Sequence, residues 1–251
     1  MTSKDHPTLT LIDVDYVQGR FKFTHPNLNQ DLWIDPKSLI FSHEKEDKVT
    51  ILEAEMKLLH LSQTFDAWFE ELLGQKCKLM YYYEAKPLRP VRPKYAQLYP
   101  ETFKSTDVTT CNFSSQATLI SWASIDEINA LFKTPFSHLR YRSNLTVTTL
   151  KSDPYQEDEW KKILIGDQVE LHFNKHCTKC TVINIDPVTG DVDPNGELLK
   201  TLSKVRKLDY GHDPVLSQER KKRVFGPPLS INCSSDQQGW LQVGDPIFVM
   251  E

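Results

Sequence analysis

The sequence has no apolar run that approaches the length of a membrane-spanning helix, which needs about 20 consecutive apolar residues. Residues 1–7 also lack the apolar core of a signal peptide and the arginine-rich amphipathic character of a transit peptide. Basic residues are not in excess, because 30 lysines and arginines stand against 34 aspartates and glutamates, a net charge of -4. The chain therefore has no general basic field that would favour nucleic acid or an anionic membrane. It also has no internal repeat and no low-complexity tract.

The cysteines do not form the pattern of a disulfide framework. There are five, an odd number, in a chain of 251 residues. This count favours a reducing compartment over an oxidising one. The composition, 39% hydrophobic and 25% charged, is that of a soluble globular protein. We therefore expect a cytoplasmic protein, long enough to form one large domain or two small ones.

Short alternating or apolar segments separated by turns occupy most of the chain and predict strands, including a closing strand pair within residues 241–249. Three segments have the three- and four-residue apolar spacing of helices. They are residues 62–74, 124–132 and 198–206. Ser62 and Gly74 suit the two ends of the first helix, whereas Ser124, with Glu127 at the capping-box spacing, predicts the start of the second. The expected fold class is α+β, mostly β, with a division near residue 105.

Two cysteines three residues apart, Cys177 and Cys180, precede an apolar, strand-like run at residues 181–186 that closes in an Asp-Pro-Val-Thr-Gly turn. Two thiols between strands suggest a soft-metal site, a redox pair or half of a zinc site. His172 and His176 would be the other zinc ligands, although structural zinc sites usually draw two separated ligand pairs. A thioredoxin-like pair is disfavoured, because a β run and not a helix is expected after the second cysteine.

A series of short motifs occurs in order along the C-terminal part of the chain. They are Arg142-x-Asn144-Leu, Tyr155-x-Glu157-Asp158-x-Trp160, Gly166-Asp167, Cys177-Thr-Lys-Cys180, Asp186-Pro-x-Thr-Gly190, Phe225-Gly226 and Val243-Gly-Asp245-Pro246. Together they resemble the MOSC family, named for the C-terminal domain of molybdenum cofactor sulfurases, and most of all its amidoxime-reducing branch. The resemblance implies a β-barrel-like MOSC domain over residues 106–251. It also implies an N-terminal-like β domain over residues 1–105, truncated at its start.

The same resemblance implies a molybdenum-cofactor site. Cys180 matches the family's molybdenum ligand, and its thiolate suits a soft-ligand site shared with the dithiolene sulfurs of the pterin. Arg142 matches a cofactor-contacting arginine, and Asn144 lies beside it on a strand edge. The other implied cofactor contacts are Thr178 and Lys179, between the cysteines, and Ser114 and Ser115. Thr178 and Lys179 keep a hydroxyl and a positive charge where the family has serine and arginine.

The activity that the resemblance implies is reduction of N-hydroxylated compounds, such as amidoximes and hydroxylamines, by a molybdenum-dependent oxidoreductase with Cys180 as the catalytic metal ligand. Electrons would come from a b-type cytochrome and its flavin reductase. The alternative is a non-catalytic module that carries cofactor or sulfur and binds the cofactor weakly or not at all. The family is also associated with pyridoxal phosphate enzymes by domain fusion, but no lysine here stands in a recognisable aldimine setting.

Departures from the family pattern favour the alternative. The family begins with a strand and loop that carry a Lys-Ser pair, whereas this chain begins after that block. Phe113 replaces a usual aspartate, and Pro228 replaces an aromatic residue. A site without these contacts would bind its cofactor weakly, because a pterin phosphate needs several anchors beyond one metal bond. If an N-terminal anchor were missing, the expected location would be the mitochondrial outer membrane.

Overall fold

The computed structural model of the protein describes residues 2–39, 46–51, 54–82, 89–91, 93–103, 108–109, 115–151, 153–206, 218, 227–236 and 239–250. Two compact units are formed, the first by residues 1–89 with 185–192 and the second by residues 90–184 with 193–251. The division near residue 105 concerns family domains and stays a prediction. Within the described ranges, no helix has both the length and the apolar character needed to cross a membrane.

Two antiparallel three-stranded sheets and one long helix make up most of the first unit. The sheets have the orders β1-β2-β3 and β4-β5-β6. The elements are η1 (Pro7–Leu11), β1 (Asp13–Val17), β2 (Arg20–Thr24), β3 (Leu32–Ile34), η2 (Pro36–Ser38), β4 (Glu46–Ile51), β5 (Ala54–His60), α1 (Gln63–Leu73) and β6 (Met80–Tyr81). Gln18 and Gly19 both have positive φ between β1 and β2, as a type I′ hairpin turn requires.

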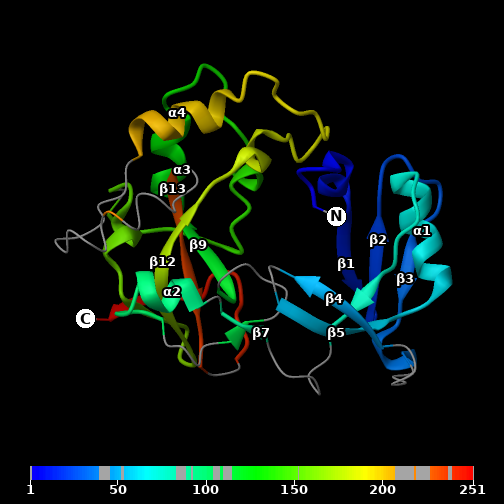
Figure 1. The fold of residues 1–251 in the computed structure, drawn as a ribbon. Helices are drawn as coiled ribbons and strands as arrows, with labels where there is room; N and C mark the ends of the chain where they lie inside the picture. Colours follow the sequence, from blue (N-terminus) through cyan, green and yellow to red (C-terminus); the bar gives the residue numbers. More distant parts are fainter. Residues whose placement is uncertain are drawn as a thin grey trace. The chain divides into compact units, whose positions relative to one another are not determined.

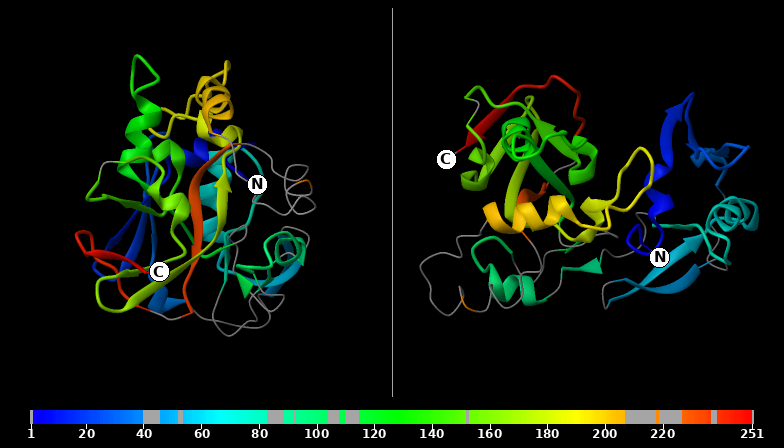
Figure 2. Two further views of the ribbon diagram at one scale, coloured as in Figure 1. Left: turned by 90° about the vertical axis from the view of Figure 1, so that its left-hand side faces the viewer. Right: turned by 90° about the horizontal axis from the view of Figure 1, so that it is seen from above.

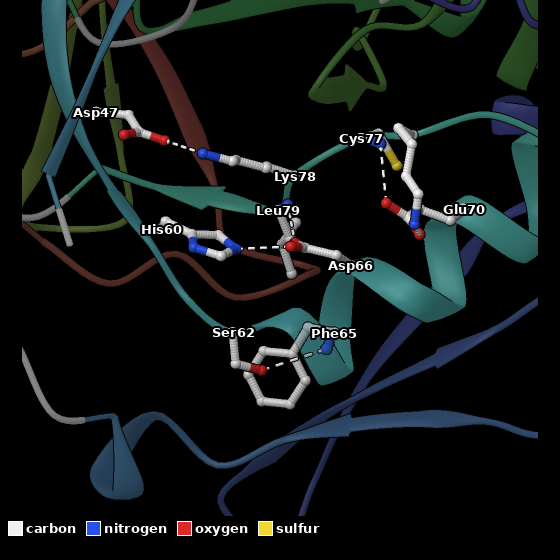
Figure 3. Close-up of polar contacts among 10 residues, drawn as sticks. Asp47, His60, Ser62, Phe65, Asp66, Glu70, Cys77, Lys78 and Leu79 are labelled. Carbon is white, nitrogen blue, oxygen red and sulfur yellow. Dashed lines mark hydrogen bonds and ion pairs between the residues drawn. The ribbon is translucent and has the colours of Figure 1, made fainter.

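Both ends of α1 follow from the sequence, and Figure 3 shows how the helix is fastened to its neighbours. Ser62 accepts a hydrogen bond from a backbone amide of the first turn, and Gly74 ends the helix in the left-handed conformation, with φ 65. The buried Asp66 accepts hydrogen bonds from the Leu79 amide at 2.7 Å and from the His60 imidazole at 2.6 Å. This carboxylate ties the helix to β5 and to the segment that enters β6.

A curled six-stranded sheet, in the order β10-β9-β13-β12-β11-β14, dominates the second unit (Figure 1, Figure 2). The elements are β7 (Arg89–Pro90), α2 (Pro93–Leu98), β8 (Val108–Thr109), β9 (Ala117–Ser121), α3 (Trp122–Asn129), η4 (His138–Tyr141), β10 (Leu145–Val147), η5 (Gln156–Glu159), β11 (Lys162–Ile165), β12 (Val169–Thr178), η6 (Thr181–Asn184), α4 (Glu197–Val205), β13 (Pro228–Ser234) and β14 (Ile247–Met250). Neighbouring strands are antiparallel except β9 and β10, which are parallel. The predicted fold class, α+β and mostly β, is confirmed.

The central strand β13 is missing from the sequence-based prediction. It pairs with β12 on one side and with β9 on the other. Its Leu229, Ile231 and Cys233 are buried in the apolar core, and the polar residues Ser230 and Asn232 between them are buried as well. This strict alternation is the period of a strand and is legible in the sequence. The closing strand pair predicted within residues 241–249 is wrong, because one strand, β14, forms there in the described chain.

Two further local predictions are wrong. Helix α3 begins three residues earlier than expected, because the N-cap is Ser121, whose hydroxyl accepts a hydrogen bond from the Ser124 amide. The run after Cys180 is not a strand, since Thr181–Asn184 forms the 3-10 turn η6. Ile183 in this turn is buried in the apolar cluster that joins α3 and α4. Packing against two helices therefore overrides the β propensity of the run.

Candidate functional site

Strand β12 separates the two cysteines into different environments. Cys177 lies inside the strand, partly buried and paired with Ser230 of β13. Cys180 lies two residues beyond the end of the strand, and its side chain is exposed. Between them Lys179 is buried, with 5% of its surface exposed. Lys179 Nζ lies 3.9 Å from Cys177 Sγ, so these two side chains share the inner side, whereas Cys180 is exposed.

The Lys179 ammonium is enclosed by acceptors of the protein itself. Its Nζ donates to the Tyr141 carbonyl oxygen at 2.8 Å and to Ser230 Oγ at 2.7 Å, and it lies 3.9 Å from Cys177 Sγ. Burial lowers the pKa of Lys179, and the Cys177 and Cys180 thiols partly oppose that shift. The side chain thus joins η4, β12 and β13 beneath the exposed Cys180.

The Cys177 thiol has a lowered pKa for an identifiable reason. Burial alone would raise the pKa of Cys177, but the positive charges of Lys179 and Lys175 and a hydrogen bond from Ser230 outweigh burial. By contrast, burial raises the pKa of the Cys233 thiol to about 12. A thiolate is the form of cysteine that binds metals and attacks electrophiles. The environment of Cys177 therefore favours its reactive form, whereas Cys233 behaves as a core residue.

Arg142 and Asn144 lie at the turn between η4 and β10. Arg142 is exposed and adopts the left-handed conformation, with φ 53. The carbonyl oxygen of the preceding residue, Tyr141, accepts from Lys179 Nζ at 2.8 Å, so the turn and the end of β12 are close in space. Asn144 Oδ1 accepts a hydrogen bond from the Thr118 amide at 2.9 Å and so braces the β9–β10 edge. A cofactor contact by either residue stays a prediction.

The two predicted serines and the threonine have different outcomes. Ser114 lies outside the described residues, as does the neighbouring Phe113. Ser115 is buried, with 7% of its surface exposed, and its hydroxyl donates to Asn232 Oδ1 at 2.8 Å. Thr178, partly buried, pairs with Pro228 at the end of β12. The Ser115 hydroxyl is therefore engaged with β13. A cofactor contact by Thr178 stays a prediction.

Several polar residues of the site are absent from the sequence-based prediction. On β13, Ser230 and Asn232 lie opposite Cys177 and Lys175 of β12. Lys175 Nζ lies 5.1 Å from the centroid of the Tyr95 ring, a cation–π contact. The result is a buried polar face on the two central strands. The alternation of residues 229–234 could have revealed it, whereas the approach of Tyr95 has no signal in the sequence.

On the opposite face of β12, Asp158 forms an ion-pair cluster. His176 Nε2 lies 3.4 Å from Asp158 Oδ1, and an Arg206 nitrogen lies 2.5 Å from Asp158 Oδ2. The Arg206 guanidinium lies 3.7 Å from the centroid of the Tyr155 ring. Burial would raise the pKa of Asp158, but the facing His176 and Arg206 side chains outweigh burial and lower that pKa. The cluster fastens η5 and the end of α4 to the strand that carries the cysteines.

Asp158→Asn should lower the free energy of unfolding at pH 7 by about 2 kcal/mol, the size of a hydrogen bond to a charged group. The folded-state pKa lies below the value of about 3.9 expected in the unfolded chain. Asp158 therefore stabilises the fold above that unfolded value, and its contribution is lost as the pH falls through the folded-state pKa. Urea unfolding at a series of pH values should show a shallower acid decline for the variant. An unchanged decline would contradict this role for Asp158.

The histidines do not come together as the zinc hypothesis requires. His176 faces Asp158, and His172 Nε2 lies 3.0 Å from Glu170 Oε1. Within the described ranges, no three His, Cys, Asp or Glu side chains are grouped so that they could hold a metal ion. A zinc site made from His172, His176 and the two cysteines therefore has no support in the observed geometry.

The donor set around Cys180 fits a molybdenum-bound pterin in its chemistry. An exposed thiol is a suitable soft ligand for molybdenum, and the exposed Arg142 guanidinium suits an anionic phosphate. Ser143, between the two predicted contacts of the turn, has a buried hydroxyl with no hydrogen-bond partner among the described residues. Buried polar groups are rarely left unpaired. The site therefore offers one metal ligand, one exposed cation and one unused hydroxyl.

Comparison with known proteins matches residues 106–248 to the MOSC domain. Mitochondrial amidoxime-reducing component 1 of Mus musculus is 27% identical over 184 residues, which cover 73% of this chain and 49% of that protein. Mitochondrial amidoxime reducing component 2 of Homo sapiens is 25% identical over 250 residues, which cover 100% of this chain and 69% of that protein. Molybdenum cofactor sulfurase of Arabidopsis thaliana is 26% identical over 266 residues, which cover 98% of this chain and 30% of that protein. The chain thus spans about half of the mouse protein and under a third of the plant one.

Proposed function

This chain belongs to the MOSC domain family, and we propose that it binds the molybdenum cofactor and reduces N-hydroxylated compounds such as amidoximes and hydroxylamines. The observation that carries the proposal is the exposed Cys180 thiol, which lies just beyond β12 and next to the buried Lys179, whose ammonium binds the turn that carries Arg142. The names of the mouse and human relatives, which describe amidoxime reduction, support the choice of substrate class.

The residues of this chain have distinct parts in that reaction. Cys180 would hold the metal through its thiolate, and Arg142 would bind an anionic group of the cofactor. A bound molybdenum would supply two-electron chemistry, in which an amidoxime, two electrons and two protons give an amidine and water. We further propose a b-type cytochrome and its flavin reductase as the electron source. We also propose a cytoplasmic location, which the odd cysteine count supports because it favours a reducing compartment. The alternative is the mitochondrial outer membrane, if an N-terminal anchor is missing from this chain.

A second candidate function is a module that carries cofactor or sulfur without catalysis. It is favoured by the plant sulfurase, which this chain matches with an identity similar to that of the amidoxime-reducing proteins. A carrier would need the exposed thiol of Cys180 but no electron-transfer partner. The two functions therefore share the cysteine and differ in whether bound metal turns over a substrate.

Expression in a cofactor-producing host, followed by metal and pterin analysis, tests the proposal. The expected result is bound molybdenum together with reduction of an amidoxime when a b-type cytochrome and its flavin reductase are supplied. Bound molybdenum without turnover would favour the carrier. Neither molybdenum nor pterin in the purified protein, or zinc at one equivalent in their place, would refute cofactor binding by this chain.

A further inference from the structure

Lys179 and Arg142 are the two cations that sequence reasoning assigned to the cofactor, and the structure gives them different surroundings. Arg142 is exposed, whereas Lys179 is buried to 5% exposure. We propose that Lys179 is a positioning residue, which holds the turn bearing Arg142 in place and does not itself contact the cofactor. The statement that the site binds the cofactor rests on the proposed function. The statement that Lys179 holds the turn does not.

Acceptors of the protein itself surround the three N–H donors of Lys179. An ammonium group has three N–H donors, and three acceptors surround this one: the Tyr141 carbonyl at 2.8 Å, Ser230 Oγ at 2.7 Å and Cys177 Sγ at 3.9 Å. These acceptors come from η4, β13 and β12, so the side chain is held from three directions. A cofactor could recruit the ammonium only by breaking one of these buried contacts. The Arg142 side chain is exposed to solvent, so it can bind a ligand without first breaking a buried contact.

The contact with Tyr141 acts directly on the conformation of Arg142. One peptide group joins the two residues: its carbonyl oxygen accepts from Lys179 Nζ, and its N–H donates to the Leu139 carbonyl at 3.1 Å. Both polar ends of the peptide plane are therefore fixed. Because the orientation of this plane sets the φ angle of the following residue, Lys179 helps to hold Arg142 at φ 53.

That conformation needs such support. A residue other than glycine in the left-handed region is unfavourable in free energy and persists only where the surrounding structure enforces it. On the far side of the turn, the Asn144 amide donates to the Thr118 carbonyl at 3.0 Å and the Asn144 side chain accepts from the Thr118 amide at 2.9 Å. Arg142 is thus clamped between the Lys179 contact and the β9–β10 edge. Loss of either clamp should let the arginine leave its position.

The first test uses the protein without cofactor. Lys179→Met should speed amide hydrogen exchange over residues 139–144 by about tenfold or more, because the Tyr141 carbonyl loses its partner. Lys179→Arg, which keeps a donor, should restore part of the protection. Lys175→Met is the matched control: this lysine also lies near Cys177 but stacks on Tyr95, so exchange at residues 139–144 should stay unchanged. If Lys179→Met leaves this exchange unchanged, the proposal is wrong.

The second test separates positioning from direct contact. Cofactor content is compared in Lys179→Met, Arg142→Ala and the double variant, all made in the cofactor-producing host. If Lys179 acts through Arg142, the double variant should retain as much cofactor as Arg142→Ala alone. Additive losses would mean that Lys179 has its own contact and would overturn the proposal. If Lys179→Met does not fold by circular dichroism, Lys179→Met with Ser230→Ala removes both members of the buried Lys179–Ser230 hydrogen bond at lower cost and still leaves the Tyr141 carbonyl without the ammonium.

Failure of this inference is distinguishable from failure of the proposed function. A wild-type protein that holds no cofactor would refute the function, yet hydrogen exchange would still decide whether Lys179 orders the turn. Conversely, a cofactor-loaded wild type with unchanged exchange in Lys179→Met would remove the positioning role alone.

Discussion

Cys180→Ser should abolish molybdenum binding while the protein remains folded. The side chain is exposed and lies beyond the end of β12, so the exchange of sulfur for oxygen disturbs no core packing. A serine hydroxyl is a harder and far less acidic donor than a thiol, and it does not replace a soft thiolate ligand. Metal analysis of the purified variant, with far-UV circular dichroism to confirm folding, should show no molybdenum above background.

Cys177→Ser is the matched control for this variant. Cys177 lies against Lys179 and Ser230 inside the strand, where it would support the site without binding the metal. Loss of a neighbouring support of this kind typically weakens metal affinity by about 10- to 100-fold, so some molybdenum should remain. Equal and complete loss in both variants would contradict the assignment of Cys180 as the single thiolate ligand.

Glu157→Ala should lower the free energy of unfolding by about 3 kcal/mol or more, because it leaves buried hydrogen-bond donors without an acceptor. Glu157 is fully buried, and its Oε1 accepts from the Ser121 amide at 2.9 Å and from Ser124 Oγ at 2.7 Å. It thereby caps the start of α3 from a segment far away in the chain, and the first turn of a helix favours negative charge. Removal also leaves a cavity beside α3. Urea unfolding followed by circular dichroism measures the loss.

Glu157→Gln is the control of similar shape. The amide oxygen can still accept both hydrogen bonds, so its loss should be about 1 kcal/mol, less than half that of the alanine variant. The pair of variants separates the lost acceptor from the lost charge. Equal losses for alanine and glutamine would show that the charge, and not the acceptor at Ser121, stabilises the start of the helix.

Local signals account for the parts of the fold that sequence reasoning predicted correctly. Helix α1 has its cap at Ser62, its terminator at Gly74 and an apolar stripe on one face, all within one short segment. Helix α4 likewise follows from the apolar spacing of Leu198 and Leu202, both fully buried. Such signals act between residues three or four apart, so a single sequence contains them in full.

The errors arise where distant residues decide the local structure. Ser121 and Ser124 both suit a helix start, and Glu157, brought in by η5, bonds to the backbone of the first and the side chain of the second. The run after Cys180 has the composition of a strand. It forms the turn η6 instead, because Ile183 packs into the apolar cluster of α3 and α4. Neither the Glu157 contacts nor the packing of Ile183 can be inferred from the neighbouring residues alone.

The sequence by itself determined the family, through the order of its motifs, together with the fold class and the helices. It also separated Cys180 from Cys177 as the proposed ligand. Only the tertiary structure decided that Lys179 points inward, because its partners Tyr141 and Ser230 lie 38 and 51 residues away in the chain. A buried ammonium must find acceptors wherever the fold supplies them, and no local pattern records which distant carbonyl and hydroxyl will meet it.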